Sequence, residues 1–279
     1  MKRLIINADD LGVNPPRSHG IFQAYEQGAV TSATIIPNGS HSDSAARRAR
    51  EWDMPTGLHL NITEGYPLSA PEHVETLLEA NGLFRDRYQL RKLLDEGRID
   101  AAHLEREMRT QLEWFLDNRG QPTHIDSHHH VHIHPAIIPL LCPILERYGI
   151  GYVRIPEEPL PPYGYEMESE RLASAKRISD QAHSARSHYK AHGIDSTEHF
   201  RGLALWGYAS KKNLRHTFGR LPEGTTELMV HPGSLAAEGT PFDVDPQRQT
   251  ELQMLIDPEM GETLERYGIE LCSYLSILA

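Results

Sequence analysis

The chain has 279 residues, and its 28 Lys and Arg against 39 Asp and Glu give a formal net charge of −11. A chain this negative lacks the basic character that nucleic acids and anionic lipids attract, which argues against both as partners. The only cysteines, Cys142 and Cys272, are far apart, so neither a disulfide framework nor a thiolate zinc site is expected. The 17 histidines are the excess to explain, and any metal ligands must be His, Asp or Glu.

The size and hydropathy of the chain are ordinary for a soluble globular protein. Apolar residues make up 39% of the sequence and charged residues 24%, and a chain of nearly 300 residues can bury a full core. No run approaches the ~18 apolar residues of a membrane helix. The apolar start, Leu4–Ile6, is shorter than the roughly 7–15 residues of a secretory signal. We therefore expect a cytoplasmic protein without a membrane partner.

Short apolar runs alternate with longer helical patterns along the chain. The sequence predicts strands at Leu4–Ala8, Ala33–Ile36, Gly57–Ile62, Thr123–Ser127, Tyr152–Ile155, and near 198–203, 227–230 and 269–273. It predicts helices after Asn14 and over Asp43–Trp52, Leu104–Leu116, Ala136–Tyr148 and Glu168–Ala191. Strands that alternate with helices indicate a parallel sheet.

The number of these units favours one barrel over an open doubly wound sheet. Seven or eight β/α units in a chain of this length fit a single α/β domain, a TIM-like (β/α) barrel over residues 1–279. No Gly-x-Gly-x-x-Gly or Walker motif follows a strand, which argues against a nucleotide-binding sheet. Residues 63–100 break the rhythm with scattered Gly and Pro, and we expect them to form an insertion over the active-site face.

Chemically active side chains lie at the ends of five predicted strands, where a parallel barrel has its active site. These side chains are Asp9 and Asp10, His59, the run from Asp126 to His134, Arg154 with Glu157, and His231. Each has an ordinary alternative: the two aspartates could cap a helix, His59 could be a buried core histidine, and the turn after His231 could be structural. The combination at strand ends is what indicates a site.

The histidine run after the fourth predicted strand has an internal order. In an extended chain, alternate residues share one face, here Asp126, His128, His130, His132 and His134. Imidazoles in a row beside a carboxylate suit a divalent metal together with the groups that orient its ligands. A solvated loop is the alternative. We assign no role to the histidines on polar segments, which are His19, His41, His73, His103, His183, His188, His192 and His216.

Five motifs together resemble those of the YdjC-like carbohydrate deacetylases. They are Asn7–Gly12, Thr31–Thr34, Gly57–Asn61, Asp126–His132 and Thr226–Gly233, and the resemblance extends from residue 4 to about residue 275. The family is similar to the wider polysaccharide deacetylase (NodB-like) group, which has a deformed (β/α) barrel and one divalent metal. The resemblance therefore implies a hydrolase that removes N-acetyl groups from amino sugars such as chitooligosaccharides and releases acetate.

The resemblance also implies residue roles. Asp10, His59 and His128 would hold the metal, with His132 as the alternative third ligand. Asp9 would be the general base and His231 the general acid. We expect Arg154 to contact a substrate hydroxyl or to orient Asp9, and we expect the substrate site to include Asn61, His130 and His132.

The resemblance implies Mg²⁺ as the metal, whereas two histidines and a carboxylate also suit Zn²⁺ or Co²⁺. The expected partner is a small N-acetylated saccharide. Enzymes of this size often pair, which leaves a homodimer open.

Three other functions remain open. A metal-dependent amidohydrolase acting on a non-sugar amide would use similar ligands, although its histidine pair usually follows the first strand. A non-catalytic metal- or sugar-binding protein would need the ligands but not Asp9 or His231. A glycoside hydrolase would need two carboxylates, such as Asp9 and Glu157, and would leave the histidines without a role.

Overall fold

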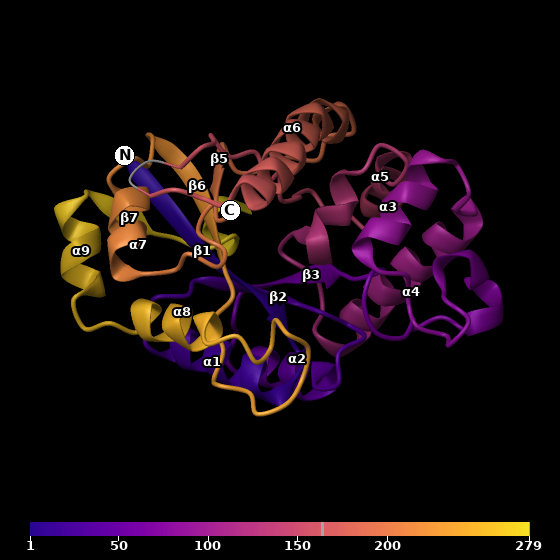
Figure 1. Ribbon diagram of the computed structural model, residues 1–279, viewed down its shortest axis with the longest axis horizontal. Helices are drawn as coiled ribbons and strands as arrows, with labels where there is room; N and C mark the ends of the chain where they lie inside the picture. Colours follow the sequence, from indigo (N-terminus) through magenta and orange to yellow (C-terminus); the bar gives the residue numbers. More distant parts are fainter. Residues whose placement is uncertain (163–164, 279) are drawn as a thin grey trace.

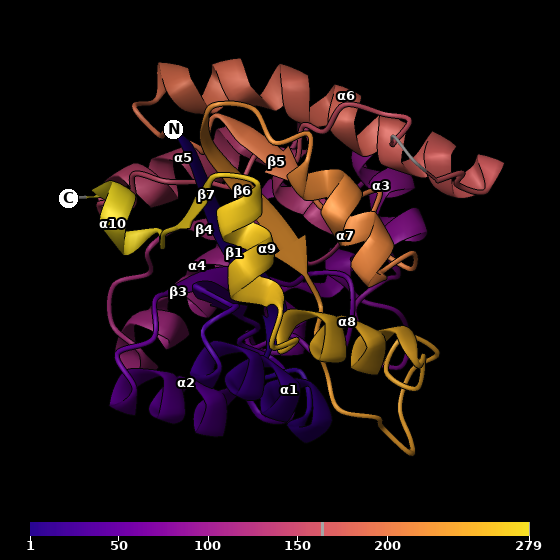
Figure 2. The same cartoon turned by 90° about the vertical axis from the view of Figure 1, so that its left-hand side faces the viewer.

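The computed structural model describes residues 1–162 and 165–278. Its centre is a curled parallel sheet that forms a half-barrel, with helices around it (Figures 1 and 2). The strands are β1 (Lys2–Leu11), β2 (Ser32–Ile35), β3 (Thr56–Leu60), β4 (Ile125–Ser127), β5 (His199–Arg201), β6 (Gly224–Val230) and β7 (Ile269–Leu271). Their order is β4-β3-β2-β1-β6-β5, and β7 also pairs with β1. The predicted class, an α/β deformed barrel, is confirmed.

The helices lie on the outside of this sheet. They are α1 (Pro15–Glu26), α2 (Ser42–Glu51), α3 (Arg87–Asp95), α4 (Ala101–Asn118), α5 (Ile138–Arg147), α6 (Ser169–Ala191), α7 (Lys211–Phe218), α8 (Gln247–Leu255), α9 (Met260–Arg266) and α10 (Leu275–Leu278). In Figure 1, α1 and α2 lie below the sheet and α6 lies above it. None of the helices in the described residues has both the length and the apolar character needed to cross a membrane.

Local sequence explains where these helices begin. The side chain of Asn14 accepts a hydrogen bond from the backbone N–H of Arg17, and prolines occupy the first turn of α1, as a helix start favours. Asp86 and Asp100 cap α3 and α4 in the same way.

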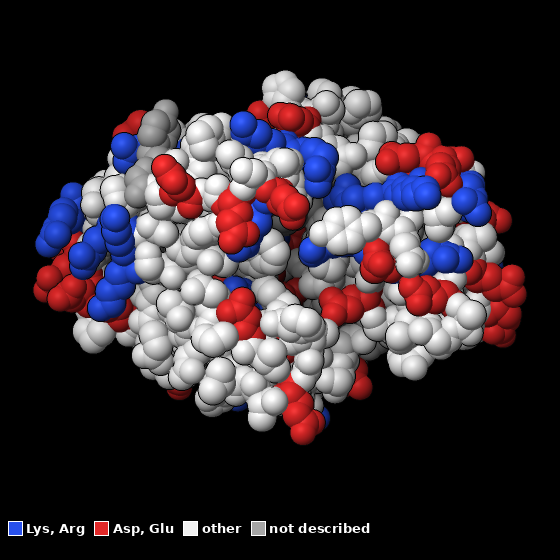
Figure 3. Space-filling view, in the orientation of Figure 1, with Lys and Arg blue, Asp and Glu red and all other residues white. Residues whose placement is uncertain are grey.

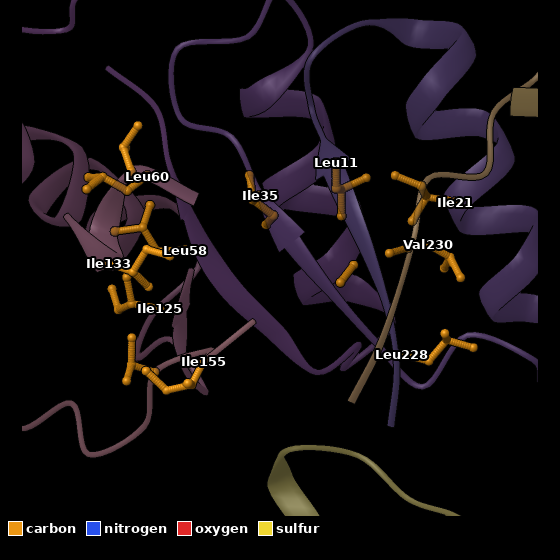
Figure 4. Close-up of a cluster of buried hydrophobic side chains, with 14 of the residues drawn as sticks. Leu11, Ile21, Ile35, Leu58, Leu60, Ile125, Ile133, Ile155, Leu228 and Val230 are labelled. Atoms are coloured by element: carbon orange, nitrogen blue, oxygen red, sulfur yellow. The ribbon is translucent and has the colours of Figure 1, made fainter. Parts of the chain in front are cut away.

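Alternation along the strands separates an apolar outer face from a polar interior. On β1, Leu4, Ile6 and Ala8 belong to the main apolar core, whereas Asn7 and Asp9 lie on the other side of the strand. The neighbouring strands follow the same rule, and Figure 4 shows apolar side chains of β1, β3, β4 and β6 packed beside the helices. The interior of the half-barrel is therefore lined by polar and ionisable side chains.

One predicted strand is absent. Tyr152–Ile155 forms only single bridges, Val153 with Ile125 of β4 and Tyr152 with Asp195. β4 is three residues long, and Pro156 has no N–H to donate, so the ladder cannot extend. The segment still follows the edge of the sheet, because Arg154 N–H donates to Ile125 O at 2.9 Å.

The turn after β6 packs directly on α1. A Cβ atom built on Gly20 would lie 2.5 Å from Cα of Gly233, so only glycine allows the helix and the turn to come this close. The contact fixes the position of His231, two residues before Gly233.

Gly20→Ala should therefore lower the free energy of unfolding by about 1–3 kcal/mol, because a methyl group is forced against backbone that cannot rotate away. Gly261→Ala in α9 is the matched control, since a Cβ there meets nothing within 4 Å. Urea denaturation measures both. Equal stability of the two variants would show that the turn can move freely.

Candidate active site

The guanidinium group of Arg154 is the centre of the barrel interior. Its Nη atoms contact both oxygens of Asp9 at 2.6 Å, Nη1 contacts Asp126 at 2.8 Å, and Nε contacts Glu227 at 2.8 Å. The side chains of Arg154, Asp126 and Glu227 are fully buried, and that of Asp9 is almost so. Nη2 also contacts Glu227 at 2.7 Å, so the guanidinium group is surrounded by three carboxylates. Of its two expected roles, this geometry fits the orientation of Asp9, because the side chain of Arg154 is fully buried and holds both oxygens of that carboxylate.

Glu227 is held from a second direction, because the hydroxyl of Tyr274 donates to it at 2.7 Å. The ring of Tyr274 stacks on His124, with centroids 3.5 Å apart. Sequence reasoning assigned neither Glu227 nor Tyr274. The alternation of β6 could have indicated Glu227, because it lies four residues before His231 and so on the same side of the strand.

A bulge gives the adjacent residues Asp9 and Asp10 different surroundings. The register between β1 and β2 shifts between Ala8 and Leu11, and Asp10 has a positive φ of 68°. In a regular strand consecutive side chains point to opposite faces, and a bulge re-aims one of them. Asp9 therefore pairs with Arg154, while Asp10 turns towards His59 and His128.

One carboxylate oxygen and two ring nitrogens lie close together at the end of β1, which makes Asp10, His59 and His128 a candidate metal centre. Oδ1 of Asp10 lies 3.3 Å from Nε2 of His59 and 3.0 Å from Nδ1 of His128. Each of these side chains is also held through its other polar atom. Arg17 donates to Oδ2 of Asp10 at 2.9 Å, Nδ1 of His59 donates to Asp126 at 2.7 Å, and Nε2 of His128 donates to Glu64 at 2.8 Å.

This arrangement fits a divalent cation. One carboxylate oxygen and two imidazole nitrogens face one point, and carboxylates orient the outer nitrogens of both rings, as is usual for metal-binding histidines. Carboxylates also surround the two imidazole rings and favour a positive charge there. Burial alone would lower the pKa of His59, but Asp126 and Asp10 raise it to about 10, and Asp10 and Glu64 raise the pKa of His128 to about 9.

The prediction of an extended histidine run is wrong. Residues His128–Ile133 form a 3-10 turn, with positive φ values of 56° at His129 and 54° at His130. The chain turns away immediately after His128, so the alternate histidines do not share a face. His132 instead bonds Ser127 and the carbonyl of Arg154 through its two ring nitrogens. It lies outside the converging group that contains His128.

The other residues expected at the substrate are also buried. His130 lies against the ring of Phe200, with centroids 6.3 Å apart. The side-chain amide of Asn61 bonds Asn38, Thr63 and the backbone of Glu64, which uses both its donors and its acceptor. Their contact with a substrate stays a prediction.

His231 lies beside Asp9, with Nε2 3.9 Å from Oδ2 of the carboxylate. Its backbone N–H donates to Glu251, and its ring meets the edge of Phe242 at 5.6 Å between centroids. Phe242 also contacts the guanidinium groups of Arg17 and Arg248, at 4.6 and 4.3 Å from the ring centroid. Burial lowers the pKa of His231 well below its usual value, and the nearby arginines add to this effect.

Burial also raises the pKa of the Asp9 carboxyl, and Arg154 offsets part of that shift. Glu157, the other carboxylate of the glycosidase alternative, bonds His183 and Arg186 of α6 instead of facing Asp9. On the face shown in Figure 3, acidic and basic side chains both border a hollow near the middle. That face has no uniformly basic surface of the kind that nucleic acids bind.

The fold and this site define a class, the parallel half-barrel proteins with a buried carboxylate–histidine cluster at the strand ends. The YdjC-like protein family matches residues 3–266. A carbohydrate deacetylase from Homo sapiens is 32% identical over 289 residues, which cover 97% of this chain and 90% of that protein. The chain belongs to the YdjC-like family.

Two further relatives extend the comparison. A chitooligosaccharide deacetylase from Serratia marcescens is 36% identical over 151 residues, which cover 53% of this chain and 58% of that protein. The structure of a candidate cellobiose-phosphate cleavage protein from Enterococcus faecalis V583 superimposes with a TM-score of 0.77 at 23% identity, over 99% of this chain and 98% of that one. This second likeness supports the fold.

Arg154→Met should lower the free energy of unfolding by about 3–5 kcal/mol, because it leaves three buried carboxylates without their cation. Arg186→Met is the control, because its ion pair with Glu157 is partly exposed and should contribute less than about 1 kcal/mol. Urea denaturation compares the two variants. A loss at Arg154 no larger than that at Arg186 would contradict the central role of this guanidinium.

Proposed function

We propose that the protein is a metal-dependent hydrolase that removes N-acetyl groups from amino sugars of the chitooligosaccharide type and releases acetate. The observation that carries the proposal is that the two aspartates at the end of β1 have different partners. Asp10 converges with two imidazoles, while Asp9 is held separately by Arg154 within 3.9 Å of His231. The names of the human and Serratia marcescens relatives support the substrate class.

Asp10, His59 and His128 would hold one divalent ion. When bound, such an ion polarises the acetyl carbonyl and lowers the pKa of a water molecule towards about 7. Two nitrogens and one oxygen suit Zn²⁺ or Co²⁺, and the family resemblance favours Mg²⁺. Three protein ligands leave positions free, as expected of a catalytic site and not of a closed structural one.

Asp9 would act as the general base. Arg154 and Asn7 fix its carboxylate, and its raised pKa suits a group that must accept a proton near neutral pH. Asp9 takes one proton from the attacking water, whose oxygen bonds the acetyl carbon.

His231 would act as the general acid. Its lowered pKa keeps the imidazole neutral at the start, so His231 first takes up, across the 3.9 Å to Asp9, the proton that the base removed from water. The imidazolium then gives this proton to the nitrogen as the carbon–nitrogen bond breaks. Bond cleavage gives acetic acid and the amine, and the proton of the acid passes to the amine, so the products are acetate and an amino sugar in its ammonium form. The protein groups return to their starting state.

Substrate choice would lie outside this cluster. Residues 63–100, which include the 3-10 turns Pro71–His73 and Glu75–Leu77 and helix α3, would form an insertion over the site. In a non-catalytic binding protein, Asp9 and His231 would have no role. The following experiment distinguishes such a protein from a hydrolase.

Asp9→Asn should retain bound metal but release acetate from N-acetylated chitooligosaccharides at least about 100-fold more slowly, because the base is lost. Acetate release and elemental analysis are measured on the same sample. Near-native turnover would rule out Asp9 as the base, and turnover absent from the metal-loaded wild type would favour a binding protein.

His59→Ala should lose the bound metal, since it removes one of three ligands. Elemental analysis after gel filtration gives the metal-to-protein ratio. His19→Ala, on the exposed surface of α1, is the matched control and should keep the metal. Stoichiometric metal in the His59 variant would contradict the ligand assignment.

A further inference from the structure

The two imidazoles of the candidate metal centre are oriented by carboxylates of very different origin. Asp126, which orients His59, is a β4 residue with a fully buried side chain, and the sheet register places it directly beside His59. Glu64, which orients His128, comes from the loop after β3, and its side chain is 43% exposed. Sequence reasoning gave Glu64 no role.

The loop that carries Glu64 is folded by two asparagines. Oδ1 of Asn61 accepts the backbone N–H groups of Thr63 and Glu64 at 3.1 and 3.2 Å, which closes a tight turn. The side-chain amide groups of Asn61 and Asn38 donate to the carbonyl of Glu64 at 2.8 and 3.1 Å. The backbone at Glu64 is therefore fixed before its side chain reaches the site.

The same loop and α3 also hold the turn that follows His128. The hydroxyl of Thr63 bonds Nδ1 of His129 at 2.9 Å. Arg91 of α3 donates to the carbonyl of His129 at 2.8 Å. Because His129 and His130 have positive φ values, these contacts stabilise a backbone conformation that non-glycine residues seldom adopt.

We propose that Glu64 is the positioning residue for His128 and thereby sets the affinity of the centre for its divalent ion. A carboxylate can only accept, so Glu64 keeps a hydrogen on Nε2 of His128. Nδ1, which faces Oδ1 of Asp10 at 3.0 Å, is then the ring nitrogen that a cation would bind in place of its hydrogen. The negative charge of Glu64 also makes Nδ1 a better electron-pair donor. This inference rests on the metal centre of the proposed function.

The test is the affinity of the metal-free protein for Co²⁺, measured by calorimetric titration after chelation. Glu64→Ala should weaken binding by about 10–100-fold, the usual cost of losing a residue that orients a ligand. Glu64→Gln should bind with intermediate affinity, because an amide oxygen still accepts the hydrogen bond but carries no charge. Glu72→Ala, at an exposed position of the same segment, should bind as the wild type does.

The series distinguishes orientation of His128 from simple support of the loop. If Glu64 only fills space, Glu64→Gln will match the wild type, and that result would overturn the proposal. Wild-type affinity of Glu64→Ala would overturn it as well. Thermal melting of the metal-free variants checks folding, and the exposed side chain predicts unchanged melting temperatures. A wild-type protein that binds no Co²⁺ would overturn the proposed metal centre itself, a distinguishable result.

Discussion

A single buried guanidinium group organises the interior of this barrel. Arg154 holds three carboxylates that would otherwise repel one another in a space closed to water. Through Asp126 it fixes His59, and through Glu227 it is tied to Tyr274 on the far side. The cost of burying these charges is offset because the guanidinium contacts a carboxylate on each of its three sides.

A local irregularity in β1 then creates two sites from two neighbouring residues. Without the bulge at Asp10, the carboxylates of Asp9 and Asp10 would point to opposite faces of the sheet. With it, Asp9 faces Arg154 and His231, while Asp10 faces His59 and His128. The protein can thus keep a carboxylate for proton transfer beside one that binds a cation, as the proposed hydrolysis requires.

Sequence could predict the fold and the strand-end residues because both follow from local periodicity. Alternation in β3 puts His59 opposite its apolar neighbours, and the same rule marks Asp9 and Asp126. The histidine run failed because the backbone of His129 and His130 is left-handed, a conformation set by tertiary contacts from Thr63 and Arg91. Glu64 could not be predicted as a partner of His128, because only the three-dimensional path of the loop brings the two together.

The central claim is that Asp10 binds the ion and Asp9 does not. Anomalous diffraction from crystals soaked in Zn²⁺ tests this directly. We expect one strong peak about 2.0–2.2 Å from Oδ1 of Asp10, Nε2 of His59 and Nδ1 of His128, with the Asp9–Arg154 pair intact. A peak bonded to Asp9 in place of Arg154, or none at this cluster, would contradict it.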